Sequence, residues 1–180
     1  MAVAGSLLGL SLHQGESYPV GKVNTLEMYP MTFEEFLWAR GFKQRMDLLQ
    51  HGMWDVVKSL RTLYIQHLRE YYLVGGMPEA VNKFIETNDA NAVREVQEEI
   101  IQAYEKDISK HAPKEQVVRI NQVWNSIPSQ LAKENKKFIY GVVKQGARAK
   151  DYELAIQWLI DAGLVYKISR VKTLGLPLKI

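Results

Sequence analysis

Apolar residues recur at intervals of three and four along most of the chain, which is the period of amphipathic helices. From Trp54 to Tyr71 this spacing is continuous and predicts one long helix that ends at Gly75-Gly76. Further helices are predicted over residues 77–88 and 89–111. The last of these ends before Ala112-Pro113, because the residue before a proline disfavours helical backbone angles.

An earlier helix has a clear start signal. Thr32 occupies the N-cap position and Glu35 follows three residues later, which is the capping-box pattern. Met31 and Phe36 occupy the positions of a hydrophobic staple, and Gly41 is placed to end the helix.

The pattern changes after residue 112. Apolar residues over 117–127 form one helical stripe, and Pro128 restarts a turn. A second helix precedes Gly163, after which residues 165–170 alternate as in a strand. Helices followed by a β-wing are typical of a winged helix, which is a helix-turn-helix variant.

The N-terminal stretch over residues 1–12 is small and apolar, and it predicts a buried strand. A lone strand needs neighbours to form a sheet, and the rest of the chain hardly supplies them. The predicted fold class is therefore mainly α, with one N-terminal strand. Three segments are expected, with bounds at 1–30, 31–111 and 112–180.

Composition places the chain among globular proteins of a reducing compartment. It has 180 residues, 47% of them hydrophobic and 24% charged, and no cysteine. No apolar run reaches the roughly 18 residues that a membrane span requires. We therefore expect a cytoplasmic protein without disulfides, cysteine ligands or a membrane partner.

The net charge of +3 conceals an asymmetry. Residues 1–111 hold 11 Lys and Arg against 15 Asp and Glu, a balance of −4. Residues 112–180 hold 12 against 5, a balance of +7. A basic C-terminal third indicates either a polyanionic or acidic partner or simply a solvated basic surface.

Six stretches in order resemble one family: prokaryotic AAA-type ATP-binding proteins with a C-terminal region of unknown function. The resemblance covers essentially the whole chain. The stretches are "GSLLGLSLHQGESYPVGKV", "MYPMTFEEFL", "YYLVGGMPEAV", "YEKDISKHAP", "VWNSIPSQLAKENKKFIYG" and "GARAKDYELAIQWLIDAGLV".

The resemblance implies a P-loop ATPase core, a helical lid, a winged helix and a nuclease-like region, with ATP and Mg²⁺ bound by the core. This chain departs from that pattern, because it contains no G-x-x-x-x-G-K-[ST] sequence and no Walker B strand. What remains resembles the last core strand, the lid and the winged helix. The missing ATPase core and nuclease-like region are then its expected partners, and the resemblance also allows a homo-oligomer. No catalytic residue is assigned, and the chain alone is expected not to hydrolyse ATP.

The resemblance also implies nucleotide-facing residues. Ser6 would be the polar sensor residue on the core strand, or a small residue needed for packing. Lys22 would meet phosphate charge, or be an exposed loop lysine. Gly75, Gly76 and Pro78 resemble the G-x-P motif that packs against adenine or ribose. The alternative is a C-cap glycine followed by a proline at a helix start, and both can hold together.

The winged-helix prediction raises DNA binding as an alternative function. The basic candidates are Lys136, Lys137, Arg148 and Lys150. Against it, the polar face of the candidate recognition helix carries Glu153, Gln157 and Asp161, and acidic residues repel phosphate. A packing role between ATPase and effector region is the other interpretation.

The remaining candidates favour structure over chemistry. The four histidines lie far apart with no i, i+4 pair, so no metal site is predicted. We expect Trp54, Trp124 and Trp158 to be core residues, and Trp38 is a further core candidate.

Overall fold

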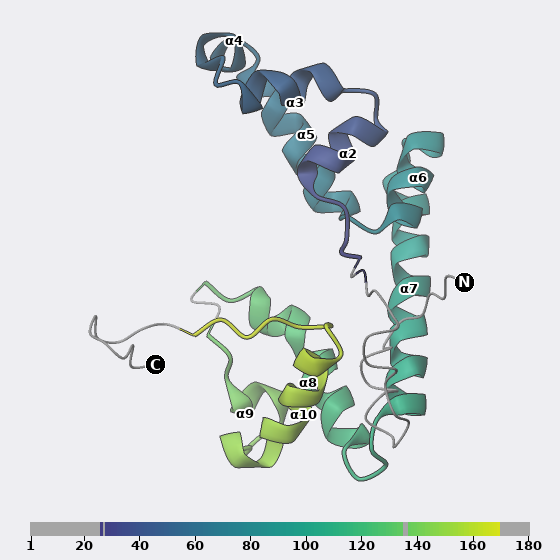
Figure 1. Cartoon of the computed structure of the whole chain (residues 1–180). Helices are drawn as coiled ribbons and strands as arrows, with labels where there is room; N and C mark the ends of the chain where they lie inside the picture. The colour runs from purple at the N-terminus through teal and green to yellow at the C-terminus, as the bar shows by residue number, and fades with distance from the viewer. Residues whose placement is uncertain (1–25, 27, 135–136, 170–180) are drawn as a thin grey trace, which may run out of the picture. The chain divides into compact units, whose positions relative to one another are not determined.

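The computed structural model describes residues 26, 28–134 and 137–169. They fall into two compact units, one within residues 24–104 and the other from Glu105 onward, and each is described by itself. Both are helical, which confirms the mainly α fold class, and the described ranges contain no strand (Figure 1). The predicted strand over residues 1–12 lies outside the described residues.

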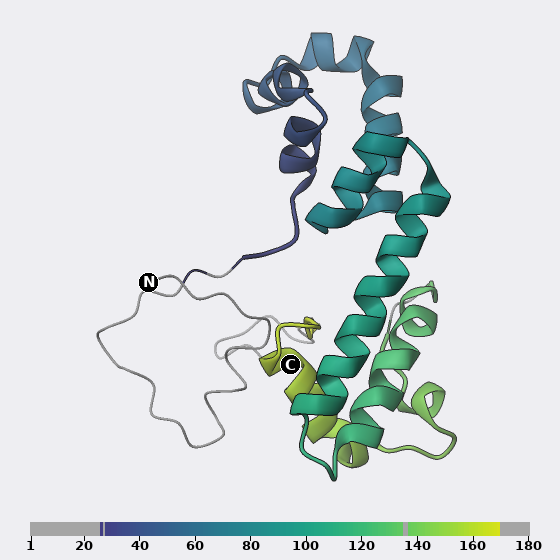
Figure 2. The ribbon, with the colours of Figure 1, turned by 90° about the vertical axis from the view of Figure 1, so that its right-hand side faces the viewer.

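The first unit contains five complete helices and the start of a sixth among its described residues. Their bounds are α2 Phe33–Ala39, α3 Lys43–Gln50, α4 Trp54–Ser59, α5 Arg61–Val74, α6 Pro78–Thr87 and α7 Ala90–His111. α7 continues into the second unit and ends directly before Ala112-Pro113, as predicted. Helices α2 and α5 lie side by side in both ribbon views (Figures 1 and 2).

The prediction of one long helix from Trp54 to Gly75 was wrong. The segment forms two helices, α4 and α5, that meet at Leu60, where φ is −96° and ψ is 12°. Just before this break the Ser59 hydroxyl donates to the carbonyl of Val56 at 2.7 Å. A side chain that bonds a nearby carbonyl competes with regular helix geometry, and hydrophobic spacing does not report this.

The start and end of α2 follow the predicted signals. The Glu35 amide donates to Thr32 Oγ1 at 3.2 Å, and the Thr32 amide donates to the Glu35 carboxylate at 2.7 Å. At the other end, Gly41 has φ 78°, and its amide donates to the Trp38 carbonyl. The next amide, that of Phe42, reaches back to Leu37, which completes a Schellman motif.

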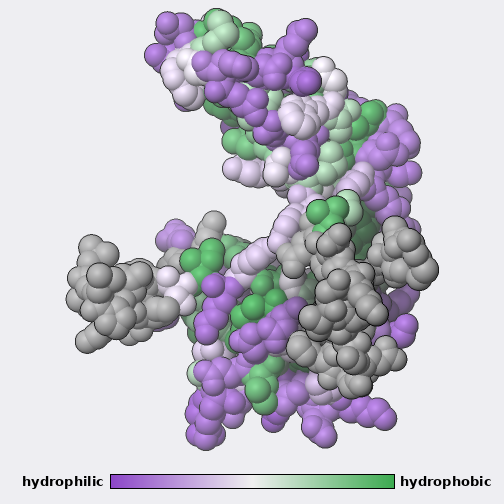
Figure 3. Space-filling view, in the orientation of Figure 1, coloured by the Kyte–Doolittle hydropathy of each residue, from purple (hydrophilic) through white to green (hydrophobic). Residues whose placement is uncertain are grey.

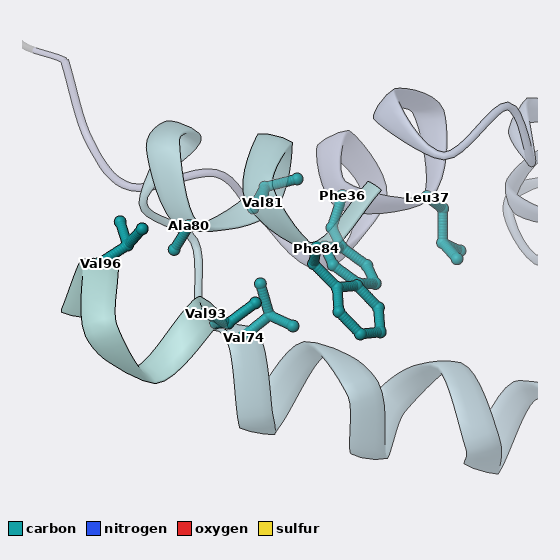
Figure 4. Close-up of a cluster of buried hydrophobic side chains, with 8 residues drawn as sticks. All are labelled: Phe36, Leu37, Val74, Ala80, Val81, Phe84, Val93 and Val96. Atoms are coloured by element: carbon teal, nitrogen blue, oxygen red, sulfur yellow. The ribbon is translucent and has the colours of Figure 1, made fainter. Parts of the chain in front are cut away.

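The core of the first unit gathers side chains from α2, α5, α6 and α7 (Figure 4). Phe36, Phe84, Val74 and Val93 all belong to this one cluster. The buried members are Phe36, Leu37, Val74, Ala80, Val81, Phe84, Val93 and Val96. The core therefore fixes the two helices that flank the turn at residues 75–77.

The second unit consists of the end of α7 followed by α8 Val117–Leu131, α9 Tyr140–Val143 and α10 Ala149–Asp161. Helices α8 and α10 pack side by side (Figures 1 and 2). Their shared core is Ile108, Ala112, Ile120, Val123, Tyr152, Ala155 and Leu159. Residues 165–169, where the alternating pattern predicted a β-wing, form no strand, and the rest of the predicted wing lies outside the described residues.

The tryptophans divide between core and surface. Trp124 and Trp158 are half-buried against the core of the second unit, but Trp54 is 59% exposed and Trp38 is 44% exposed. Trp54 is therefore not a core residue, because the break at Leu60 leaves the short helix α4 outside the core. Hydrophobic residues show on the surface among hydrophilic ones near α3 and α4 (Figure 3). No helix in the described ranges is long and apolar enough to cross a membrane.

Candidate functional site

The turn between α5 and α6 carries the predicted nucleotide motif. Gly75 caps α5, and its amide donates to the Tyr71 carbonyl at 2.8 Å. Its backbone has φ 76° and ψ −169°, a region that is essentially restricted to glycine. Pro78 follows as the first residue of α6, so the C-cap glycine and the N-terminal proline of the structural interpretation are both present.

Gly76 has a different reason to be glycine. A Cβ added there would lie 2.3 Å from the carbonyl oxygen of Met31 and 3.1 Å from Pro30 Cβ. The Met31 amide donates to the Gly76 carbonyl at 2.6 Å, and the Tyr71 hydroxyl donates to the Met31 carbonyl at 2.8 Å. The paired glycines therefore let the turn approach the backbone of the segment that precedes α2.

This packing changes how the motif is interpreted. Glycine at residue 76 permits a close approach, and the residues that lie close to it are Pro30 and Met31 of the same chain. Pro78 is exposed and keeps a free apolar face for a ligand or partner. Ser6 and Lys22 lie outside the described residues, and their predicted roles stay predictions.

A buried polar cluster near the same core was missed by the sequence analysis. His67 is 3% exposed, and its Nδ1 lies 3.0 Å from Glu70 Oε2. Arg45 donates to His67 Nε2, and Arg40 forms an ion pair with Glu70. Because arginine can only donate, Nε2 of His67 accepts, and the proton of the neutral ring is on Nδ1, where it bonds Glu70.

Aromatic rings lie close to both guanidinium groups. Arg40 lies 5.1–5.5 Å from the ring centres of Phe36, Phe42 and Phe84, and Arg45 lies 3.9 Å from that of Phe42. These distances are typical of cation–π contacts. The cluster therefore joins α2, α3, α5 and α6 as a packed structural network, with its polar atoms turned toward one another.

The cluster shifts the pKa of two of its groups. Burial acts to raise the pKa of Glu70, but hydrogen bonds from His67, Arg40 and Gln66 and the charge of Arg40 together hold it below the ordinary value. Burial raises the pKa of Tyr64, whose hydroxyl donates to the Arg45 carbonyl at 2.6 Å. Glu70 is therefore an ionised partner at neutral pH.

Only one sequence signal pointed to this cluster. His67 and Glu70 are three residues apart and so share a face of one helix. The arginines that complete it lie on α3 and at the end of α2, and spacing within one helix does not report contacts between helices.

The nucleic-acid candidates belong to the second unit and its loops. Lys136 lies outside the described residues, and Lys137 and Lys150 are exposed. Arg148 precedes α10; its Nε lies 3.6 Å from the Asp151 carboxylate, and its side chain is 71% exposed. Such an exposed pair is weak, so Arg148 stays available to a phosphate.

The outer face of α10 agrees with the predicted polar face. Glu153, Gln157 and Asp161 are exposed, and Gln157 donates to Asp161 at 2.7 Å. Leu154 is also 70% exposed on this helix. An acidic face with an exposed leucine suits a protein partner better than the phosphates of a DNA groove.

The part of the chain that the structure describes contains no group of three His, Cys, Asp or Glu side chains that could hold a metal ion. Comparison with curated proteins and with solved structures found no match. Comparison with protein families matched residues 65–177 to a family described as a domain of unknown function, DUF8612. The match covers more than half of the chain and takes in helices of both units. The chain therefore belongs to this family of domains of unknown function.

Proposed function

We propose that this chain is the lid and winged-helix part of an AAA-type ATP-binding protein, and that it couples nucleotide state to an effector region without hydrolysing ATP itself. The observation that carries the proposal is the anchoring of Met31 to the turn at residues 75–78. In the family that the sequence resembles, the segment before residue 31 comes from the ATPase core, and the turn faces the nucleotide.

This anchoring supplies a physical route for coupling. The Met31 amide and carbonyl are both held, by the Gly76 carbonyl and the Tyr71 hydroxyl. The segment lies so close to Gly76 that an added Cβ would clash with its backbone. A displacement of the core would therefore move α5 and α6 together with the segment.

The absence of a P-loop sequence predicts no turnover by the chain alone. Incubation of the purified chain with ATP and Mg²⁺, followed by a phosphate assay, should give no release above the blank. Metal-dependent ATP hydrolysis by the chain would refute this part of the proposal. The reading frame upstream of the Met1 codon gives an independent test, because the proposal requires a Walker A and Walker B pair there.

A second candidate function is a winged-helix module that binds DNA or a protein partner. It is favoured by three successive helices: α8, the four-residue α9, and α10. Three helices in succession are found in three-helix variants of the helix-turn-helix. The basic balance of residues 112–180 supports it further.

A salt-dependent gel shift distinguishes DNA from a protein partner. If DNA is bound, combined alanine substitution of Lys136, Lys137 and Arg148 should abolish the shift, and binding should weaken steeply with salt. A matched control with Glu153→Ala and Gln157→Ala leaves the basic residues intact. No shift with the wild type at low salt would exclude the DNA form of this function.

A further inference from the structure

The outer face of α5 contains an open hollow of about 460 Å³ that the proposed function does not use. Its lining residues all come from this one helix and follow its three- and four-residue spacing. They are Arg61, Thr62, Ile65, Gln66 and Arg69.

Two cations flank an apolar centre in this hollow. Arg61, Ile65 and Arg69 are spaced four residues apart, so they form one stripe in which the arginines are about 12 Å apart along the helix axis. Both arginines are exposed, and within the described ranges neither has an ion pair or a side-chain hydrogen bond. Ile65 is 37% exposed between them.

The rest of the unit makes this stripe an exception. Residues 24–104 hold eight Lys and Arg against twelve Asp and Glu, a balance of −4. Two of the eight basic residues lie together here, and the hollow contains no acidic side chain. The stripe therefore complements two separate carboxylates with an apolar group between them, whereas the acidic surrounding unit would repel an extended polyphosphate.

We propose that this stripe docks an acidic, amphipathic helical segment of a protein partner. Its carboxylates would pair with Arg61 and Arg69, and an apolar side chain between them would cover Ile65. A helix with acidic, apolar and acidic residues at four-residue intervals repeats the spacing of α5 and fits the stripe along its length. The inference rests on this surface alone and does not depend on the proposed function.

The experiment measures the fluorescence anisotropy of a labelled helical peptide in which Glu, Leu and Glu follow one another at four-residue intervals. The full chain should bind this peptide and should not bind the same peptide with Lys in place of both Glu residues. Combined Arg61→Ala and Arg69→Ala substitution should weaken binding about tenfold, and added salt should weaken the wild type more than this variant. Circular dichroism should show both chains equally folded, because the two arginines are exposed and form no ion pair with any residue that the structure describes.

The matched control is the combined substitution of Lys43→Ala and Arg94→Ala, which removes the same charge from exposed side chains on α3 and α7. It should leave peptide binding unchanged. Three results would overturn the proposal: no binding by the wild type, an equal loss in the control, or tighter Arg61- and Arg69-dependent binding of a short DNA duplex. Sedimentation that shows a dimer lost with Arg61 and Arg69 would also overturn it, because the occupant would then be a second copy.

Discussion

Replacing Gly76 with alanine tests the anchoring of Met31 to the turn at residues 75–78. The new Cβ would lie 2.3 Å from the Met31 carbonyl oxygen, where ordinary contact begins at 3.4 Å. Relief therefore needs a displacement of about 1 Å, and the atoms that must move are backbone. The same displacement stretches the 2.6 Å bond from the Met31 amide to about 3.6 Å, at which it is no longer a hydrogen bond.

The cost follows from two terms. Overpacking that shifts backbone costs about 1–3 kcal/mol, and the lost hydrogen bond costs about 1 kcal/mol more. The sum of about 2–4 kcal/mol corresponds to a fall in melting temperature of about 10 °C or more for a unit of this size. Because the chain has two units, circular dichroism should be paired with hydrogen exchange. Lost protection should be confined to peptides from residues 24–104.

Gly141→Ala is the matched control. Gly141 lies in α9, its added Cβ meets nothing within 4 Å, and it has no positive φ. The control should be neutral or stabilising by up to about 1 kcal/mol. A Gly76→Ala variant that melts within about 2 °C of the wild type would refute both the close approach and the coupling route built on it.

Three further predictions concern other contacts. Burial acts to raise the pKa of Glu70, but hydrogen bonds from His67 and Arg40 hold it below the ordinary value of 4.5. The stability that the ionised carboxylate contributes is therefore complete above pH 4.5 and is lost as the pH falls through the lowered pKa. In urea unfolding, Glu70→Gln should lose less stability than the wild type when the pH is lowered. Gln130 is 4% exposed and makes two hydrogen bonds, of 2.9 and 3.0 Å, to the loop backbone that follows α8. Gln130→Ala should therefore cost about 1–3 kcal/mol in urea unfolding of the second unit, and a loss below about 0.5 kcal/mol would contradict this. Pro78→Ala should lower the melting temperature by only a few degrees, because the exposed ring acts mainly by restricting the unfolded chain.

Local signals predicted the parts of the fold that depend on neighbouring residues. The capping box at Thr32 and Glu35 and the end of α2 at Gly41 are confirmed, because each involves hydrogen bonds within a few residues. The long helix from Trp54 was wrong for the complementary reason. Periodicity reports which face is apolar, but it does not report a backbone break at Leu60 that keeps the period on both sides.

The candidate site depended on contacts that sequence spacing cannot report. "YYLVGGMPEAV" allowed either punctuation between helices or close approach to a ligand, and the two glycines have different roles. Gly75 supplies a backbone conformation, and Gly76 admits Met31, which lies far away in sequence. What the turn still offers to a nucleotide or partner is the exposed ring of Pro78. If the turn acts in coupling, Gly76 carries the movement of the Met31 segment to the turn, and Pro78 contacts the nucleotide. In a protein that contains the P-loop, substitution of Gly76 should therefore lower stability, and substitution of Pro78 should weaken nucleotide binding.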